Sequence, residues 1–331
     1  MTAAIATHQL SKDYTFHRQR PGLSGALFGL FSRQRETRRA LDAFDLLIEP
    51  GELVGLLGRN GAGKTTTVKL CCGLLRPSAG SVEVLGFEPW KREFAFLRRI
   101  AVVLGQKSML WWDVSAMDSY LVHRAMYDLE RGFFARRVSE LAELLSIESL
   151  LDVPVRKLSL GERMKAELLA ALLHGPDVLF LDEPTIGLDV ISRLAVRDFL
   201  REINQTHGTT IVLTSHDMGD VEALCERVLL VDHGRLSYDG TLVDLVRSTR
   251  PAKQLTLIYE RPPGLPDRLP PGVDVHYDGG VRVELSVRRD LVTWLLREVP
   301  TWGELADVDV AEADLDDVMR TVLATDPEGP R

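Results

Sequence analysis

The sequence predicts an α/β protein in which a mostly parallel β-sheet is covered by helices on both faces, with a small α+β domain after it. From residue 41 to about 245, short apolar runs alternate with segments of helical periodicity, as in parallel sheets buried between helices. A glycine-rich segment of fixed spacing joins one apolar run to a helical one. From residue 251 the pattern changes to alternating apolar and polar residues. A chain of 331 residues holds roughly two domains, which we expect at 1–245 and 251–331.

Four short apolar runs are expected to form buried strands of the first domain. They are rich in Val, Leu and Ile, and they cover residues 52–57, 177–182, 209–215 and 228–232. Helical periodicity is present over residues 138–147 and 162–173. Since ligands of a parallel sheet bind beyond the carboxyl ends of its strands, we expect the site at that edge.

The second domain is expected to be small. Alternation over residues 255–259 and 281–287 predicts two strands, separated by a Pro/Gly-rich loop. A helix over 291–299, a strand over 303–310 and a helix over 315–323 follow. No recognisable site chemistry is present in this part of the sequence.

Composition and charge limit the class of protein. The chain has 45% hydrophobic and 27% charged residues, as is ordinary for a soluble globular protein. Its three cysteines have neither disulfide-framework nor zinc-ligand spacing, which fits a reducing cytoplasm. No signal peptide or apolar run of membrane-spanning length is expected. The net charge of −8 argues against nucleic-acid binding. This charge is unevenly distributed: residues 251–331 carry −7 and residues 1–250 carry −1, and within the latter the segment 17–40 carries +5.

The glycine-rich segment fits the phosphate-binding pattern G-x-x-x-x-G-K-[ST]. It consists of Gly58, Arg59, Asn60, Gly61, Ala62, Gly63, Lys64 and Thr65, and Thr66 continues into a predicted helix over 66–74. Glycines let backbone N–H groups surround phosphate oxygens, and the positive helix N-terminus points at the same anion. Lys64 would reach the β- and γ-phosphates, and the Thr65 hydroxyl would bind Mg²⁺. The alternative is a glycine-rich turn without a ligand.

Two carboxylates follow the apolar run at 178–181. Asp182 at the strand end would hold Mg²⁺ directly or through water. Glu183 points to the other face of the chain and is the candidate base that orients the attacking water. The alternative is an acidic strand end that caps the next helix.

Further motifs occur in a fixed order along the chain. Gln106 follows a strand-like run at 100–104, the segment LSLGE (158–162) precedes a helix, GLD (187–189) follows the carboxylates, and His216 ends another strand. This order resembles the ATPase subunit of ABC transporters over residues 5 to about 245. The tract GQKSMLWWD (105–113), the phrase VRKLSLGERMKAEL (155–168) and the acidic tail look most like ATPase subunits of ABC-2-type exporters.

The resemblance implies a P-loop NTPase fold, with a RecA-like sheet core and a helical subdomain at about 107–160. It implies that Tyr14 stacks on adenine, that Gln106 contacts Mg²⁺ and senses the permease, and that His216 contacts the γ-phosphate. Asp189 would link the two sites of a dimer. The signature residues Ser159, Gly161 and Glu162 would complete the site of the partner subunit.

The implied function is ATP hydrolysis that powers export through a separate ABC-2-type membrane permease. The implied cofactors are ATP and Mg²⁺, and the implied location is the cytoplasmic face of the plasma membrane. A single copy of each motif favours a homodimer with two ATP molecules between the subunits. The alternatives are the ATPase of an importer and a non-transport ABC ATPase that acts on ribosomes or DNA.

Three features leave alternatives open. Leu160 and Glu162 replace the glycine and glutamine of the common LSGGQ signature, and Ser159 with Glu162 also forms a capping-box pattern. The Arg-rich segment 17–40, which looks inserted, is either an amphipathic element on lipid or permease or a solvated loop. Trp111 and Trp112 either contact the permease or belong to the core.

Overall fold

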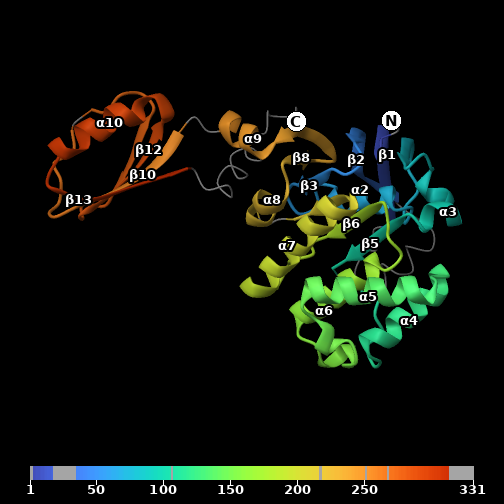
Figure 1. The fold of residues 1–331 in the computed structure, drawn as a ribbon. Coiled ribbons are helices and arrows are strands. Elements are labelled where there is room, and N and C mark those ends of the chain that lie inside the picture. The colour runs from blue at the N-terminus through green and yellow to red at the C-terminus, as the bar shows by residue number, and fades with distance from the viewer. Residues whose placement is uncertain are drawn as a thin grey trace, which may run out of the picture. The chain divides into compact units, whose positions relative to one another are not determined.

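The computed structural model describes residues 3–17, 35–105, 107–215, 218–249, 252–266 and 268–312. The chain divides into two compact units, Met1–Gly240 and Thr241–Arg331 (Figure 1). The predicted residues Gln106 and His216, the segment 18–34 and the predicted helix at 315–323 lie outside the described residues.

The first unit is built on a six-stranded sheet. Its strand order is β5-β6-β7-β3-β8-β9. The strands are β3 (Leu53–Leu57), β5 (Ile100–Leu104), β6 (Val178–Asp182), β7 (Thr210–Thr214), β8 (Arg227–Asp232) and β9 (Arg235–Thr241). The pairs β5–β6, β6–β7, β7–β3 and β3–β8 are parallel. The predicted parallel sheet is therefore confirmed, and the four predicted strands agree with it to within one residue at each end.

Helices connect these strands. They are α2 (Lys64–Cys71), α3 (Phe94–Leu97), α4 (Ala116–Tyr127), α5 (Arg131–Leu145), α6 (Leu160–Leu172), α7 (Val190–His207) and α8 (Met218–Leu224). The helix predicted at 138–147 begins earlier, because the Glu130 carboxylate caps its start by accepting from the amides of Gly132 and Phe133, both at 2.7 Å. Figure 1 shows α4 and α5 gathered beside α6, and the Tyr120 hydroxyl on α4 donates to the Ala166 carbonyl on α6 at 3.0 Å.

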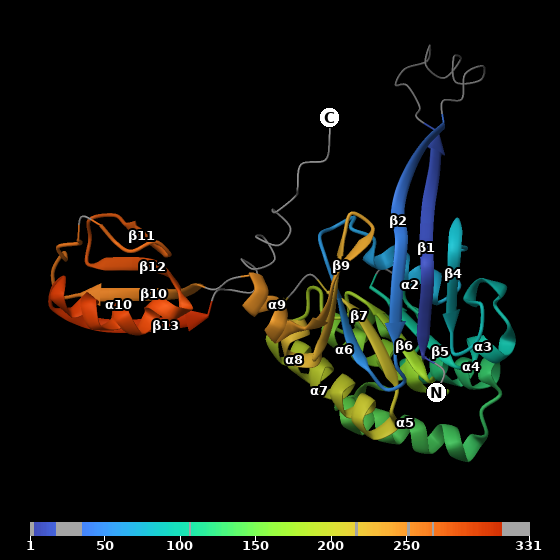
Figure 2. The ribbon, with the colours of Figure 1, turned by 90° about the horizontal axis from the view of Figure 1, so that it is seen from above.

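A second sheet, whose strands the sequence pattern does not predict, lies in the same unit. It is antiparallel, has the order β2-β1-β4, and consists of β1 (Ile5–His17), β2 (Arg35–Ile48) and β4 (Ala79–Val84). β4 pairs with β1 only as far as Ser11, whereas β2 pairs with it to His17. Figure 2 shows β1 and β2 continuing together past the end of β4. We call residues 12–17 and 35–41 of this pair the ribbon.

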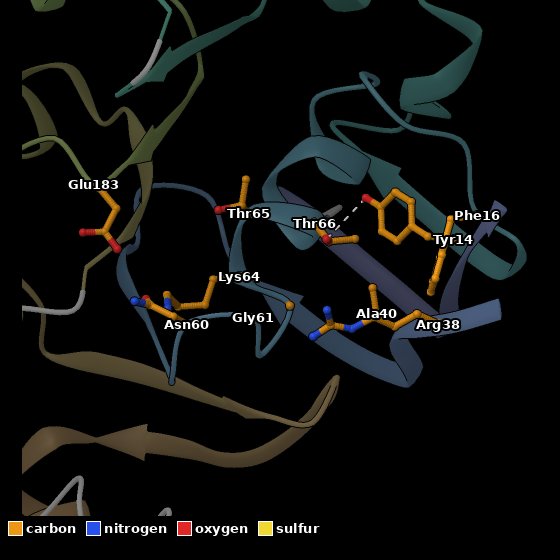
Figure 3. A pocket seen from close by; sticks show the side chains of 11 residues that line it. Tyr14, Phe16, Arg38, Ala40, Asn60, Gly61, Lys64, Thr65, Thr66 and Glu183 are labelled. Atoms are coloured by element: carbon orange, nitrogen blue, oxygen red, sulfur yellow. Dashed lines mark hydrogen bonds between the residues drawn. The ribbon is translucent and has the colours of Figure 1, made fainter. Parts of the chain in front are cut away.

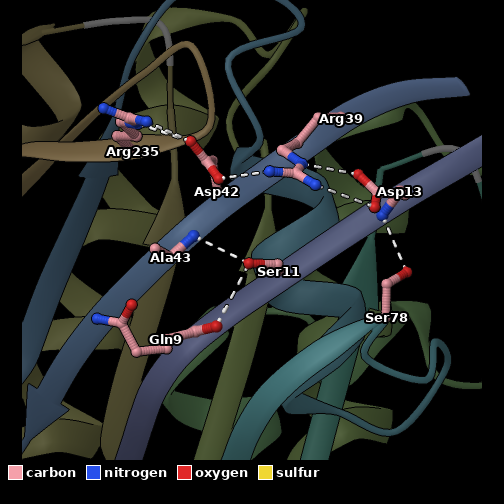
Figure 4. A network of polar contacts seen from close by, with 8 residues as sticks. All are labelled: Gln9, Ser11, Asp13, Arg39, Asp42, Ala43, Ser78 and Arg235. Atoms are coloured by element: carbon pink, nitrogen blue, oxygen red, sulfur yellow. Dashed lines mark hydrogen bonds and ion pairs between the residues drawn. The ribbon is translucent and has the colours of Figure 1, made fainter.

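The ribbon corrects one expectation. The sequence places residues 35–40 in an Arg-rich insertion expected to be an amphipathic element or a loop, but they form part of strand β2. Side chains fasten them in place (Figure 4). Arg39 on β2 is paired with Asp13 on β1 at 2.9 Å and with Asp42 at 2.9 Å. Asp42 in turn pairs with Arg235 on β9, which joins the ribbon to the edge of the parallel sheet.

One hydrophobic core joins the two sheets. Buried residues of β1, β2 and β4 pack with residues of β3, β6 and helix α2, including Phe44, Ile48, Leu56, Val68 and Phe180. Burial on this scale resists relative sliding, because interiors are close-packed. The segment between β3 and α2 is therefore held against both sheets.

The second unit contains helix α9 (Leu242–Thr249) and a four-stranded antiparallel sheet with the order β11-β12-β10-β13. The strands are β10 (Ala252–Tyr259), β11 (Val273–Tyr277), β12 (Arg282–Arg288) and β13 (Leu305–Glu312), and helix α10 is Val292–Glu298. Leu255, Leu285 and Leu295 lie in its core. Across the described residues of both units, none of the helices is both long and apolar enough to cross a bilayer.

Candidate functional site

The loop between β3 and α2 requires glycine at two positions. At Gly58, with φ of +146°, a Cβ would lie 2.2 Å from the Val231 carbonyl oxygen on β8. At Gly63, with φ of +123°, a Cβ would lie 2.9 Å from the Ala40 carbonyl oxygen on β2. Both positions combine a backbone conformation that favours glycine with a contact too close for any side chain. The loop is consequently held in one path between the two sheets.

Lys64 opens helix α2 and is buried, with 6% of its surface exposed. Its Nζ donates to the carbonyl oxygens of Gly58 at 2.6 Å and Arg59 at 3.3 Å. Burial lowers the pKa of the ammonium, while the nearby charges of Glu183 and Asp182 act to raise it. The ammonium group therefore lies against the loop, where the oxygens of a bound phosphate would be charged partners for it.

Asp182 stands where three strands of the parallel sheet end side by side. It accepts hydrogen bonds from the Thr65 hydroxyl at 3.0 and 3.2 Å and from the Thr214 hydroxyl on β7 at 2.7 Å. A threonine hydroxyl and a carboxylate are hard oxygen donors of the kind that Mg²⁺ binds, together with water and substrate phosphates. Among the described residues no group of three His, Cys, Asp or Glu could hold a metal by itself. The donors therefore fit Mg²⁺ that arrives with a phosphate ligand.

Glu183 follows Asp182 at a sharp change of backbone direction. Its φ is +57°, in the left-handed region that non-glycine residues rarely adopt. Its amide donates to the carbonyl oxygen and to the hydroxyl of Thr214, both at 3.1 Å, which holds this conformation. The turn sends the Glu183 side chain into the cavity, away from the Asp182 contacts. Such strain is often found at functional positions.

One cavity of about 480 Å³ is lined by Lys64, Thr65 and Glu183, whereas Asp182 is not among its lining residues (Figure 3). Its lining comprises Tyr14, Phe16, Arg38, Ala40, Asn60, Gly61, Gly63, Lys64, Thr65, Thr66 and Glu183. The volume is within the range of sites for small molecules. The Tyr14 hydroxyl lies 3.4 Å from the Thr66 hydroxyl, so the ribbon returns this aromatic to the loop despite the long segment after it. Phe16, Arg38 and Ala40 were not predicted as site residues, because their place at the cavity depends on the pairing of β1 with β2.

The signature residues begin helix α6. Ser159 is the N-cap, with its hydroxyl accepting from the Glu162 amide at 3.2 Å, and the Glu162 carboxylate accepts from the Ser159 amide at 2.8 Å. The hydrogen bond from the Ser159 amide, and after it one from the Ser159 side chain, lower the pKa of the Glu162 carboxyl. The capping box is thus present. In the part of the chain that the structure describes, the cavity lining includes none of Ser159, Gly161 and Glu162.

Gly161 and Asp189 connect this helix to the next one. A Cβ on Gly161 would lie 2.1 Å from the Ser192 hydroxyl oxygen and 2.6 Å from its Cβ. Asp189 is the N-cap of α7 and accepts from the Ser192 amide at 2.9 Å and hydroxyl at 2.7 Å, and these bonds lower its pKa. The starts of α6 and α7 are therefore in tight contact.

A buried polar network secures the chain on either side of the site. Asp220 on α8, 1% exposed, accepts from the Thr185 hydroxyl and from Arg197 Nε on α7 at 2.7 Å. Neither Asp220 nor Arg197 lies in a sequence motif, so neither is expected at the site from the sequence alone. Their network ties the segment after Glu183 to the helix that follows position 216.

The two tryptophans near position 106 are on the surface. Trp111 is 52% and Trp112 is 53% exposed, so the alternative that places them in the core is wrong. Arg163 lies over the Trp112 ring, 5.6 Å from its centroid. The Gly105 amide donates to the Asp182 carbonyl oxygen at 3.2 Å, which brings this segment next to the carboxylate strand.

Comparisons with known proteins show what this chain is similar to. A family model described as "ABC transporter" matches residues 41–186. "ABC transporter ATP-binding protein NatA" of Bacillus subtilis (strain 168) is 34% identical over 229 residues, covering 69% of this chain and 92% of that protein. "Daunorubicin resistance ATP-binding protein DrrA3" of Streptomyces coeruleorubidus is 36% identical, covering 64% of this chain and 66% of its own.

A similar fold is found among solved structures. A chain described as a dimeric post-hydrolysis state of the ATP-binding cassette MJ0796 bound to ADP and Pi has a TM-score of 0.60 and 21% identity, covering 72% of this chain and 98% of that one. At this identity the likeness concerns the fold, which agrees with the sheet and helices described above.

Proposed function

Because the chain belongs to the ABC transporter family as an ATP-binding, ATP-hydrolysing subunit, we propose that it powers export through a separate ABC-2-type membrane permease. One observation carries the catalytic part of the proposal: the phosphate loop and Glu183 line the same cavity, beside the contact between Thr65 and Asp182. The export direction rests on relatives named for drug resistance and Nod factor export.

Each group at the cavity has a role that follows from its chemistry. The loop amides and the N-terminus of α2 would bind the phosphates, and Lys64 would exchange its carbonyl partners for phosphate oxygens. Thr65 and Asp182 would hold Mg²⁺, which when bound neutralises phosphate charge. Glu183 would accept a hydrogen bond from water and direct it at the γ-phosphate. Tyr14 would stack on the adenine ring.

A second copy of the chain would complete each site. Within one chain, Ser159, Gly161 and Glu162 do not join the described cavity lining, although a helix N-terminus such as the start of α6 favours the binding of anions. A head-to-tail pair would place this helix start over the phosphate held by the other copy. Gln106 and His216, as family motif positions, would add contacts to Mg²⁺ and to the γ-phosphate.

The permease would dock at the cytoplasmic face of the plasma membrane, on the surface around Trp111 and Trp112. Both side chains are about half exposed and follow position 106 closely, and aromatic residues are enriched at interface centres. Alanine at both positions is expected to abolish co-purification with a permease encoded beside this gene. Alanine at Trp294, an exposed tryptophan of the second unit, should leave it unchanged, and equal losses in the two variants would contradict the assignment.

The catalytic role of Glu183 is tested by Glu183→Gln. The variant is expected to bind ATP normally, to lose about 100-fold or more of its hydrolysis rate, and to accumulate as an ATP-bound dimer in gel filtration. Glu143→Gln on the exposed surface of α5 is the matched control and should hydrolyse ATP normally. Near-normal turnover by Glu183→Gln would remove Glu183 from the mechanism.

A further inference from the structure

The ribbon places a second group, besides Tyr14, on the wall of the cavity. Tyr14 pairs with Arg38 in the register of β1 and β2. Directly opposed residues of antiparallel strands project from the same face of the sheet, as do residues two apart along one strand. Tyr14, Phe16 and Arg38 therefore share one face, and all three line the cavity together with Ala40, which lies at a register shift of the pair. Figure 3 shows this face turned towards the phosphate loop.

The Arg38 guanidinium lies against the tip of that loop. A Cβ built on Gly61 would be 3.4 Å from Arg38 Nη2, and Figure 3 shows the side chain extended towards Gly61. Lys64 is held on the inner side of the loop by the carbonyl oxygens of Gly58 and Arg59. The two cations thus approach the loop from separate directions.

The neighbouring arginine behaves differently. Arg39 is directed to the opposite face of the ribbon, where Asp13 and Asp42 pair with it. Considering only residues that the structure describes, Arg38 has no such carboxylate or other hydrogen-bond acceptor. A guanidinium carries five donors in a planar fork that suits phosphate oxygens. Arg38 therefore has both the chemistry and the position to take an anionic ligand in the cavity.

We propose that Arg38 binds the phosphate chain of the nucleotide, between the base on Tyr14 and the terminal phosphates at Lys64. This inference rests on the proposed function, because it assumes that ATP occupies the cavity. Arg38 is a nucleotide-binding residue in addition to the motif residues, and it comes from a strand that carries none of them. It raises nucleotide affinity through a charge-assisted hydrogen bond made equally to nucleotides of any base.

The test measures binding of ADP, GDP and a non-hydrolysable ATP analogue by calorimetry to the full-length protein. Arg38→Met keeps the apolar stem and removes the charge, and Arg38→Lys keeps the charge without the fork. Arg38→Met is expected to weaken ADP and GDP by the same factor of about 10, as expected for one charge-assisted hydrogen bond at a partly exposed site. Arg38→Lys should retain part of the affinity. Arg39→Ala removes an equal charge from the opposite face and should change ADP affinity by less than about twofold.

Three outcomes would overturn the inference. ADP affinity of Arg38→Met equal to that of the unaltered protein would show that Arg38 makes no contact. A loss for ADP without a loss for GDP would place Arg38 on the adenine base instead of the phosphates. An equal loss in Arg39→Ala would show that removing a ribbon charge, or the ion pairs that hold the ribbon, lowers the affinity without any contact from Arg38. In each case the unaltered protein still binds and hydrolyses ATP; if it does neither, the proposed function itself fails.

Discussion

Alanine at Gly161 is expected to force apart the starts of helices α6 and α7. The new Cβ would lie 2.6 Å from the Cβ of Ser192, whereas side-chain carbons in contact are about 3.5 to 4.0 Å apart. No rotation of Ser192 relieves this overlap, because a Cβ does not move with χ1. The two helix starts must therefore separate by roughly 1 Å.

The cost of this change has two parts. Overpacking of this kind costs about 1–3 kcal/mol. Loss of the 2.7 Å hydrogen bond from the Ser192 hydroxyl to Asp189 adds about 1 kcal/mol. A total of about 2–4 kcal/mol lowers the melting temperature of a unit of this size by about 4–16 °C. ATP hydrolysis should fall as well, because the proposed signature begins at the displaced turn.

The assay compares thermal unfolding and ATP hydrolysis of Gly161→Ala with two double variants. Adding Ser192→Gly removes both overlapping atoms and should restore most of the lost melting temperature, once the effect of Ser192→Gly alone is subtracted in a double-mutant cycle. Adding Ser192→Ala leaves the Cβ at 2.6 Å and should rescue little. Unchanged melting of Gly161→Ala, or equal rescue by both double variants, would refute the steric argument.

Three further predictions concern the loop, a buried histidine and the signature. Gly58→Ala places a Cβ 2.2 Å from the Val231 carbonyl oxygen and should abolish ATP binding by calorimetry; retained affinity would contradict the close contact. Burial lowers the pKa of His174 from 6.5 to about 4, so the unfolded chain binds an extra proton between these values and stability falls by about 3 kcal/mol as the pH drops from 7.5 to 4. Urea denaturation should show this loss, and His174→Gln should lack it. Glu162→Gln keeps the capping box but removes a negative charge from the start of α6, so the free energy of unfolding should fall by up to about 1 kcal/mol. ATP hydrolysis should rise, because a carboxylate at this helix start weakens its attraction for the γ-phosphate. Slower hydrolysis would contradict this.

Local sequence was sufficient to predict the strand–loop–helix at residues 53–71 and the position of the two carboxylates at the end of β6. Gly58 to Thr65 are contiguous, and the strand before them and the helix after them have the expected patterns. The contact of Thr65 with Asp182 joins residues 117 positions apart. It was nevertheless expected, because both residues were predicted to bind the same Mg²⁺. Parallel strands end at one edge of their sheet, so groups that follow different strands meet there.

The second wall of the cavity depended on tertiary structure. Residues 35–40 read as part of an Arg-rich insertion, because strand β2 pairs with β1 across a long connection and through several register shifts. Alternation of side chains is hard to see in sequence when bulges interrupt it. Only the register reveals that Arg38 lies opposite Tyr14 and shares its face.

By itself, the sequence determined the parallel sheet, the phosphate loop and the pair of acids, since each depends on a short contiguous pattern. The tertiary structure decided which face of the ribbon meets the loop, which of two adjacent arginines points into the cavity, and how closely Gly161 packs on Ser192. These features depend on pairing between distant segments and on interatomic distances. A shift of one residue in the register of a strand moves each of its side chains to the opposite face of the sheet, and local sequence alone does not specify that register.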